Sequence, residues 1–544
     1  MRTLPLLPAL LGLLVLLPTP VREVGAEEQE TAFEGFARAP DPAEVGGPDA
    51  DLYLEGVALQ QKGKYRSARK RFWRLIEEYP DSPYAPEAED RSGPNAFLGF
   101  TLMHEPRPSE RRIDVALMGD GYLFDRQDRF NKDAVGHLKV MLKEPTLAAY
   151  ESYFNFWRFN LASKDTGVDE VEPILPDEER EEHEKRRKKK RKVRTFETAL
   201  DCKAAGPQGQ VAANPRCVWH YLSYLDVNDA LAVCFAKKGA LGMGGMGIAT
   251  TGPKGVVVHE FGHAFGGLLD EYANNPGPPS GFTESANTTT NRQSPPWKHF
   301  LEVGYPGVGV FEGGATFQKG VWRPAHGCAM NTGGNEYCPV CREATLLMIY
   351  TYVSPIDVVR PAERVVHRGP DGWPAIELEP MRPATHALEV EWFLGDEPPV
   401  TETDEPERTA EDDFEEGMLT EAEKKLWERI KRRRKAEGRT APRTSVPHKP
   451  GLVRRRRGTG RDDAPVGERI KGKKRKARGG ARIHSPVLPD LGPGRYLLTA
   501  VVRDPAKPRG ARHPWVLKDD QGLLEDRHAF VLVVPGGEPA DDGP

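Results

Sequence analysis

Apolar positions in the first part of the chain change from helical spacing to a mixture of short strands and helices. Residues 49–90 contain two amphipathic stretches, which predict a helical hairpin with its turn at Gly63. After Arg112, short apolar runs alternate with a helical period, which predicts an α/β (α+β) domain over residues 112–355. Its first expected elements are a strand at 113–118, a helix at 124–142 and a strand at 154–163.

The last part of the chain predicts an all-β domain over residues 356–535. Apolar and polar side chains alternate through residues 388–394 and again through residues 496–502. Several short strands of this kind are typical of an immunoglobulin-like β-sandwich. Residues 401–485 interrupt the pattern with charged low-complexity sequence, which has too little apolar surface to fold alone. We therefore expect one sandwich split by an insertion.

The amino-terminal hairpin has a repeat-like spacing. Gly56, Ala68, Phe72 and Pro80 fall at the offsets of one tetratricopeptide-like unit. Such a hairpin either binds a peptide or partner, or simply packs on the following domain. The second interpretation is favoured, because a single repeat cannot bury its own apolar face.

Residues 1–26 have the pattern of a secretory signal peptide. Arg2 gives a positive start, residues 10–17 are apolar, and the small residues before Glu27 suit a cleavage site. Residues 27–48 are acidic and rich in Pro and Gly, which predicts a linker. We expect a secreted or cell-envelope protein; the alternative is an uncleaved amino-terminal anchor.

Charge excludes one class of partner for the molecule as a whole. The 544 residues carry a formal net charge of only -4, so the chain is not a polybasic nucleic-acid binder. Residues 177–194 form a charged insertion that is first Glu-rich and then Lys/Arg-rich. It has no interleaved aromatic residues to stack bases, so we predict no nucleic-acid partner. A solvated surface loop is favoured, and contact with an anionic polymer or membrane surface is the alternative.

Six cysteines in an exported chain predict disulfide bonds. Cys202 and Cys217 flank a Gly/Pro-rich loop that one bond would close. Cys338 and Cys341 have the spacing of half a zinc knuckle, but no second pair stands at a matching distance. The plainest role for this pair is a disulfide with Cys328, although the sequence leaves the pairing open.

The strongest chemical signal is the run from Val256 to Tyr272. His259 and His263 are four residues apart, so a helix places both imidazoles on one face, where they suit a divalent ion such as zinc. Glu260 is rotated away from that face and is placed to act as a general base on a metal-bound water. The competing interpretation is a core helix with two hydrogen-bonded histidines.

Zinc needs a third protein ligand for an open, catalytic site. A straight helix would carry Asp270 too far from the histidines to share an ion. The Gly266–Gly267 pair offers a break, because glycine tolerates the backbone angles of a sharp reversal. A reversal there brings back Asp270 or, failing it, Glu271.

The run HEFGHAFGGLLDEY resembles the active-site helix of the IgA-peptidase-type zinc metallopeptidases, a metzincin-like family. Three further segments resemble signatures of that family, and the likeness spans roughly residues 112–355. In better-known metzincins a histidine stands where this chain has Leu269. The segments are 118–122 (MGDGY), 163–169 (SKDTGVD), and 327–331 (GCAMN) followed by 338–343 (CPVCRE).

The resemblance implies further roles. Met330 would form the methionine turn beneath the metal. The strand Ile248, Ala249, Thr250 would lie at the edge of the cleft and bind an extended substrate through its main chain. Two loop aspartates in the amino-terminal motifs, Asp120 and Asp165, are candidate ligands for a second ion, but such residues more often form turns.

These observations predict a secreted zinc-dependent metalloendopeptidase that uses a Zn²⁺ cofactor and acts on protein or peptide substrates. His259, His263 and Asp270 are the expected ligands, with Glu271 as the alternative to Asp270, and Glu260 is the expected base. Two other functions stay open. One is a zinc hydrolase of non-protein amides such as cell-wall links, and the other is a secreted binding protein with an inactive metal site.

Overall fold

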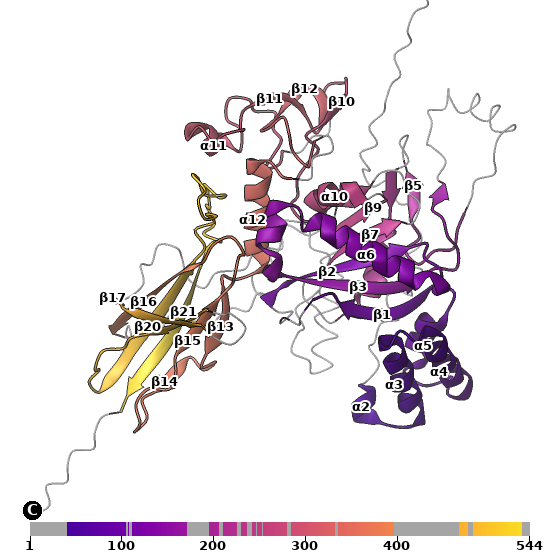
Figure 1. The fold of residues 1–544 in the computed structure, drawn as a ribbon, viewed down its shortest axis with the longest axis horizontal. Helices are drawn as coiled ribbons and strands as arrows, with labels where there is room; N and C mark the ends of the chain where they lie inside the picture. The colour runs from indigo at the N-terminus through magenta and orange to yellow at the C-terminus, as the bar shows by residue number, and fades with distance from the viewer. Residues whose placement is uncertain are drawn as a thin grey trace, which may run out of the picture.

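The computed structural model is mixed α/β and contains several sheets, as the sequence predicts (Figure 1). No helix among the residues it describes is long and apolar enough to cross a membrane. The expected signal peptide at 1–26, most of the 27–48 linker and the charged insertion at 177–194 lie outside the described residues. These are 41–104, 107, 111–170, 195–205, 210–225, 230–236, 242–245, 247–252, 254–279, 284–331, 336–396, 467–476 and 482–535.

A six-stranded sheet forms the centre of the α/β domain, in the order β1-β3-β2-β7-β9-β8. Its four inner strands are parallel, and each edge strand is antiparallel to its neighbour. The inner strand β2 is buried along its whole length, which is why it reads as a continuous apolar run. The strands are β1 (Ala96–Leu102), β2 (Ile113–Asp120), β3 (Phe154–Ala162), β7 (Ala230–Ala236), β8 (Met243–Gly245) and β9 (Ile248–Thr251).

Alternate residues of the inner strands enter two different cores, one on each face of the sheet. On one face Val115 and Leu117 join a large cluster with the helices α6 and α10. On the other face Ala116 and Met118 pack with α9. This division follows from the two-residue period of a strand. The helices of the domain are α6 (Gln127–Met141), α7 (Pro145–Ala149), α9 (Pro215–Leu222), α10 (Val257–Ala264), α11 (Lys298–Glu302) and α12 (Pro339–Tyr352).

Two small sheets complete this part of the chain. The first has the order β4-β5-β6 and the second the order β10-β12-β11. The second follows α10 in the chain and receives the segment that leaves the predicted metal site. Their strands are β4 (Asp169–Glu170), β5 (Lys203–Ala205), β6 (Gln210–Ala212), β10 (Ala273–Asn275), β11 (Phe311–Gly314) and β12 (Thr316–Arg323).

The amino-terminal region contains more helix than the predicted hairpin. Two helices form the hairpin, a third follows them, and a short helix lies inside the predicted linker. The Nε2 atom of Gln60 donates to the backbone oxygen of Phe97 at 3.1 Å, so the hairpin is attached to β1 of the central sheet. The helices are α2 (Pro42–Val45), α3 (Pro48–Gln61), α4 (Tyr65–Glu78) and α5 (Ala85–Ser92).

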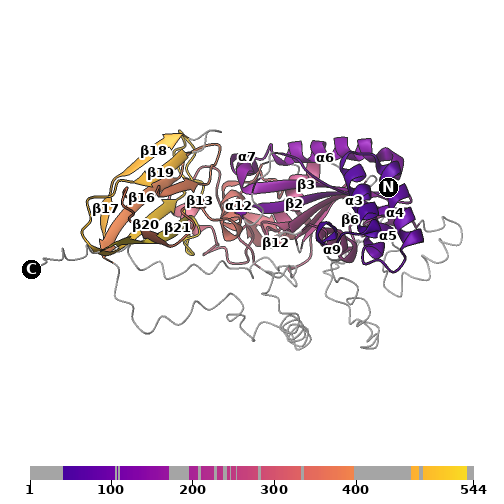
Figure 2. The same ribbon diagram turned by 90° about the horizontal axis from the view of Figure 1, so that it is seen from below.

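Two further sheets form the carboxyl-terminal domain, in the orders β13-β15-β19-β18 and β14-β21-β20-β16-β17. Leu378, Trp392, Leu498 and Phe530 from these sheets are buried in one core cluster. Figure 2 shows the two layers at the opposite end of the molecule from the amino-terminal helices. The strands are β13 (Ile356–Arg360), β14 (Val365–His367), β15 (Glu377–Pro380), β16 (Glu389–Asp396), β17 (Glu468–Ile470), β18 (Gly472–Lys476), β19 (Arg482–Pro486), β20 (Gly494–Arg503) and β21 (Glu525–Val534).

The predicted insertion, 401–485, extends too far toward the carboxyl end, so its predicted boundary at residue 485 was wrong. Residues 401–466 lie outside the described residues, but three strands begin after them, within 468–486. All five residues of β18 are exposed, so this strand has no apolar alternation for the sequence to reveal. It is held by backbone pairing with β19, which tolerates the basic side chains.

Gly56 provides a test of the hairpin. A Cβ atom at this position would lie 2.5 Å from Cε1 of the fully buried Phe72 ring. We expect Gly56→Ala to destabilise this region by about 1–3 kcal/mol through overpacking. Gly136→Ala is the matched control in the helix α6, because the nearest obstacle there is the flexible end of Lys254. Thermal unfolding of both variants measures the difference, and equal unfolding temperatures would contradict this packing.

Candidate metal centre

The helix α10 brings the two histidines of the motif together. Their Nε2 atoms are 3.1 Å apart. Nδ1 of His259 lies 2.8 Å from the backbone oxygen of Ala329, and Nδ1 of His263 lies 2.6 Å from that of Leu268. A carbonyl oxygen only accepts, so both Nδ1 atoms carry the hydrogen. In the neutral form, both Nε2 lone pairs therefore face the same point.

Asp270 supplies a third donor at that point. Its Oδ1 atom lies 3.0 Å from Nε2 of His259 and 3.2 Å from Nε2 of His263. The helix α10 ends at Ala264, and Gly267 has a positive φ of 61°, so the predicted break occurs. The structure therefore places Asp270, rather than Glu271, beside the histidines.

The electrostatics of the three groups favour a cation between them. Burial lowers the pKa of His263, but the hydrogen bond and the charge of Asp270 outweigh it and raise that pKa to about 9. Burial also lowers the pKa of His259, but the carboxylate of Asp270 raises it above its ordinary value. Burial raises the pKa of Asp270, and the two imidazoles hold it well below its ordinary value. A site with these preferences binds a proton or a metal ion.

The donor set fits zinc. Zinc ligands at 2.0–2.1 Å in a tetrahedron stand about 3.3 Å from one another. The three observed separations are 3.0–3.2 Å. Oδ1 of Asp270 is buried and faces both imidazole Nε2 atoms, which lie 3.0 Å and 3.2 Å away. Both histidines also have the backbone-carbonyl support at Nδ1 that metal-ligating histidines use.

Glu260 stands beside this donor set without entering it. One carboxylate oxygen lies within 4.8 Å of the ligating nitrogens of both histidines. The residue is 6% exposed, and burial raises the pKa of its carboxyl to about 7, although both imidazoles lower it. A carboxyl group with that pKa can accept a proton and return it near neutral pH.

The methionine loop lies directly under α10. A Cβ atom added to Gly262 would lie 2.6 Å from the Sδ atom of the fully buried Met330. Tyr337 donates from its hydroxyl to the backbone oxygen of Val258 at 2.8 Å, which fastens the same loop to the helix. Met330 is therefore a hydrophobic support beneath the histidines.

The predicted substrate strand is not at the edge of the sheet. The strand β9, which contains Ile248, Ala249 and Thr250, pairs with β7 on one side and with β8 on the other. All three residues are buried. The edge strand is β8, which the sequence hides because Met243, Gly244 and Gly245 lie in a glycine-dense segment.

Two residues that sequence reasoning passed over position the third donor. Tyr272 forms a hydrogen bond to Asp270, and its ring lies parallel to that of His259, with a centroid distance of 6.1 Å. Asn287, in the loop between β10 and α11, is fully buried and forms hydrogen bonds with both the backbone N–H and the backbone oxygen of Leu269. The Asp-Glu-Tyr run pointed to Tyr272, but nothing in the sequence distinguished Asn287 from other asparagines in polar loops.

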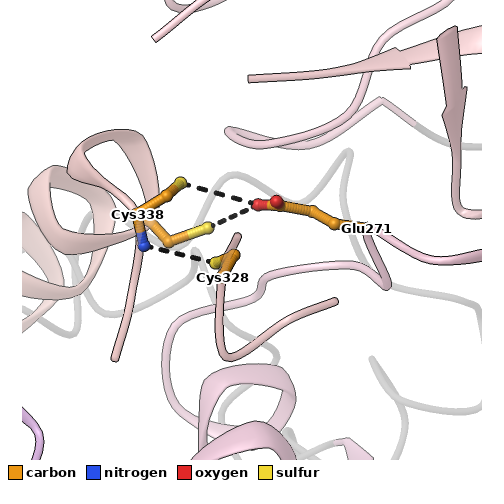
Figure 3. A group of neighbouring side chains, drawn as sticks. Glu271, Cys328 and Cys338 are labelled. Atoms are coloured by element: carbon orange, nitrogen blue, oxygen red, sulfur yellow. Dashed lines mark hydrogen bonds between the residues drawn. The ribbon is translucent and has the colours of Figure 1, made fainter. Parts of the chain in front are cut away.

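The expected disulfides are not formed, and all six cysteines are free. Cys328, Cys338 and Cys341 do come together, as predicted, but as thiols. They surround the carboxylate of Glu271, and Figure 3 shows this side chain reaching toward the cysteines. The sequence gives no sign of this grouping because Glu271 is distant from the cysteines in the chain.

Asp120, the last residue of β2, and Asp165 bind the distant segment 197–202 through hydrogen bonds and do not form local turns. The carboxylate of the fully buried Asp120 accepts from the backbone N–H of Leu200 at 2.8 Å and from the hydroxyl of Thr198 at 2.8 Å. Asp165 accepts from the backbone N–H of Glu197 at 3.0 Å. Neither belongs to a metal-binding group among the described residues.

Residues 102–183 match the family model described as IgA Peptidase M64. The match supports an IgA-peptidase-type metallopeptidase. The matched segment contains both amino-terminal motifs, 118–122 and 163–169, and ends before the histidine motif. The predicted family is therefore confirmed by a part of the chain that is separate from the metal centre. No curated protein matches the chain.

Two neighbouring glycines in β8 test how the edge strand of this peptidase meets α10. A Cβ atom at Gly244 would clash with the backbone oxygen of Glu260 and would lie 2.8 Å from Cβ of His263, whereas Gly245 faces open space. We expect Gly244→Ala to displace β8 and to lower both activity and unfolding temperature, at a cost of about 1–3 kcal/mol. Gly245→Ala is the control and should resemble the parent in both measurements. Equal effects from the two variants would contradict the contact.

Proposed function

We propose that the protein is a zinc metalloendopeptidase. The observation that carries this proposal is the convergence of two imidazole nitrogens and one carboxylate oxygen, all within 3.2 Å of one another, with a second carboxylate nearby. Three protein donors leave one position for water, which is the arrangement of a catalytic rather than a structural zinc site. The family match supports the peptidase class.

His259, His263 and Asp270 would hold the ion. Zinc bound there supplies a water of lowered pKa and polarises the scissile carbonyl. Glu260 would accept a proton from water in the site and return it to the leaving amine. Burial of this carboxyl raises its pKa above the ordinary value. Tyr272 keeps Asp270 in place through its hydrogen bond and therefore acts as a positioning residue.

The edge strand β8 is the proposed surface for an extended substrate. It is antiparallel to β9 and has no strand on its other side in the described sheet. A peptide added there would pair with the main chain of β8. Gly244 contacts the histidine helix directly, so a peptide on β8 would run beside the metal centre. This placement favours peptide bonds over cell-wall amides as the substrate.

The finer class of the domains is part of the same proposal. The parallel sheet, the histidine helix and the methionine beneath it support a metzincin-like peptidase domain. The two packed sheets at the carboxyl end support an immunoglobulin-like sandwich. The signal-like pattern at residues 1–26 supports a secreted or cell-envelope location.

Asp270 tests the ligand set. Asp270→Ala removes one of three donors, so we expect the purified chain to retain one equivalent of zinc less than the parent after dialysis. Asp165→Ala is the matched control, because it removes another loop carboxylate that lies outside the centre. Elemental analysis of the dialysed proteins measures the difference. Zinc retention equal to the parent would exclude Asp270 as a ligand.

Glu260 tests the chemistry. Glu260→Gln keeps the side-chain size but removes the base, so we expect a loss of roughly 10²–10⁴-fold in kcat with zinc retained. Cleavage of casein, measured with and without a chelator, follows the reaction. Glu284→Gln, in an exposed loop of the same domain, is the control and should cleave as the parent does. A Glu260→Gln variant as active as the parent would refute the mechanism.

A further inference from the structure

A second group of metal-binding side chains lies next to the histidine centre. Cys328, Cys338, Cys341 and Glu271 are all buried, and their ligating atoms lie within 4.8 Å of one another. Sγ of Cys341 is 3.0 Å from Oε1 of Glu271, and Sγ of Cys338 is 3.7 Å from the same atom. We propose that these four residues bind a second, structural zinc ion.

The upper bound of 4.8 Å on the separations between the ligating atoms is compatible with one shared ion. Zinc–sulfur bonds of about 2.3 Å in a tetrahedron place sulfur atoms about 3.8 Å apart. Four protein donors close the coordination sphere, so this site would hold no reactive water, in contrast to the three-donor centre at the histidines. Its role would be structural.

The backbone around Cys328 is arranged for a thiolate. The N–H groups of Met330 and Cys338 point to the Sγ atom of Cys328, at 3.4 Å and 3.3 Å. Two donors to one sulfur favour the charged form, which is the form that binds metal. Figure 3 shows the hydrogen bond from the backbone N–H of Cys338 to Cys328, with the side chain of Glu271 approaching from the other side of the group.

Glu271 provides the independent observation that a cation belongs here. Its side chain is fully buried, and its Oε2 atom has no hydrogen-bond partner among the described residues. The amide of Asn287 and the thiols of Cys338 and Cys341 donate to Oε1, and none of these neutral donors supplies a positive charge. A buried carboxylate normally has a cationic partner or a proton.

The charge of the complete site is one that proteins tolerate. Three thiolates and one carboxylate around a divalent ion have the same net charge as the four-cysteine zinc sites that occur widely. The two backbone donors and the Asn287 amide offset part of that charge. The group therefore needs no further cation to be stable in the interior.

The second ion would fix the shape of the first site. It would join three segments, which are the loop after α10 through Glu271, the methionine loop through Cys328, and the start of α12 through Cys338 and Cys341. Glu271 is bonded covalently to Asp270, so an ion that holds Glu271 also limits the movement of Asp270. The second site does not depend on the proposed hydrolysis, because it needs only the four donors.

Metal content of the full chain tests the proposal. The parent should retain two equivalents of zinc, and X-ray absorption at the zinc edge should show sulfur as well as nitrogen and oxygen neighbours. His263→Ala should retain one equivalent, with sulfur neighbours dominant. Loss of sulfur scattering in this variant would overturn the second site while leaving the histidine centre as proposed.

Cysteine variants and a thiol count complete the test. Cys341→Ser should lose the sulfur-ligated equivalent and unfold at a lower temperature, whereas Cys217→Ser, which removes a half-buried thiol outside the group, should retain both ions. The parent, denatured in chelator without reductant, should show six reactive thiols. Four thiols together with a single zinc would mean that two of the clustered cysteines form a disulfide. Six thiols with a single zinc would mean that the group is protonated and empty, and either result overturns the proposal.

If Cys341→Ser fails to fold, cobalt substitution of the parent decides the question. Cobalt(II) bound by thiolates gives intense near-ultraviolet charge-transfer absorption, which a site of two histidines and an aspartate does not give. That absorption should be present in the cobalt-loaded parent and in cobalt-loaded His263→Ala. Its absence from both would overturn the proposal.

Discussion

The fixed tautomers of two histidines determine the chemistry of this molecule. Each Nδ1–H is held by a backbone carbonyl, one at Ala329 in the methionine loop and one at Leu268 just beyond the helix. Both Nε2 atoms then face the Oδ1 atom of Asp270, and when both imidazoles are neutral these three acceptors repel one another unless a proton or a metal ion lies between them. The fold around the helix holds these three groups together, and a metal ion turns that repulsion into attraction.

Two neighbouring residues connect this centre to a second buried group. Asp270 faces the histidines, and Glu271 faces three cysteines. Consecutive residues of a non-helical segment can point to opposite sides, so one short stretch of chain contributes to both groups. The backbone N–H of Glu271 also donates to the oxygen of Met330 at 2.6 Å, which ties that stretch to the methionine loop. The geometry of the third donor therefore depends on the cysteine group.

Local patterns predicted the parts of the structure that depend on neighbours in sequence. The HExxH helix, the break near Gly267 and the apolar strand β2 follow from helix spacing, glycine freedom and a continuous apolar run. The edge position of β8 and the grouping of Glu271 with the cysteines depend on chain segments that are distant in sequence. A disulfide with Cys328 was predicted for the Cys338–Cys341 pair because no second cysteine pair stands at a matching distance, and Glu271 is too distant in the chain to be recognised as a partner.

The helix α12 extends this dependence to the carboxyl-terminal sheets. Its first turn carries Cys341, and its last turn carries Tyr350, whose hydroxyl contacts that of Tyr153 at 2.8 Å and also donates to the carboxylate of Asp504. Nε2 of His386 lies 2.5 Å from the same carboxylate, and every residue of this network is buried. The carboxyl-terminal domain therefore holds the far end of α12. Buried polar networks of this kind favour one arrangement, because an incomplete network leaves groups unpaired. The cysteine end of α12 therefore belongs to a helix whose other end is fixed by the carboxyl-terminal domain, and Figure 1 shows α12 between that domain and the central sheet.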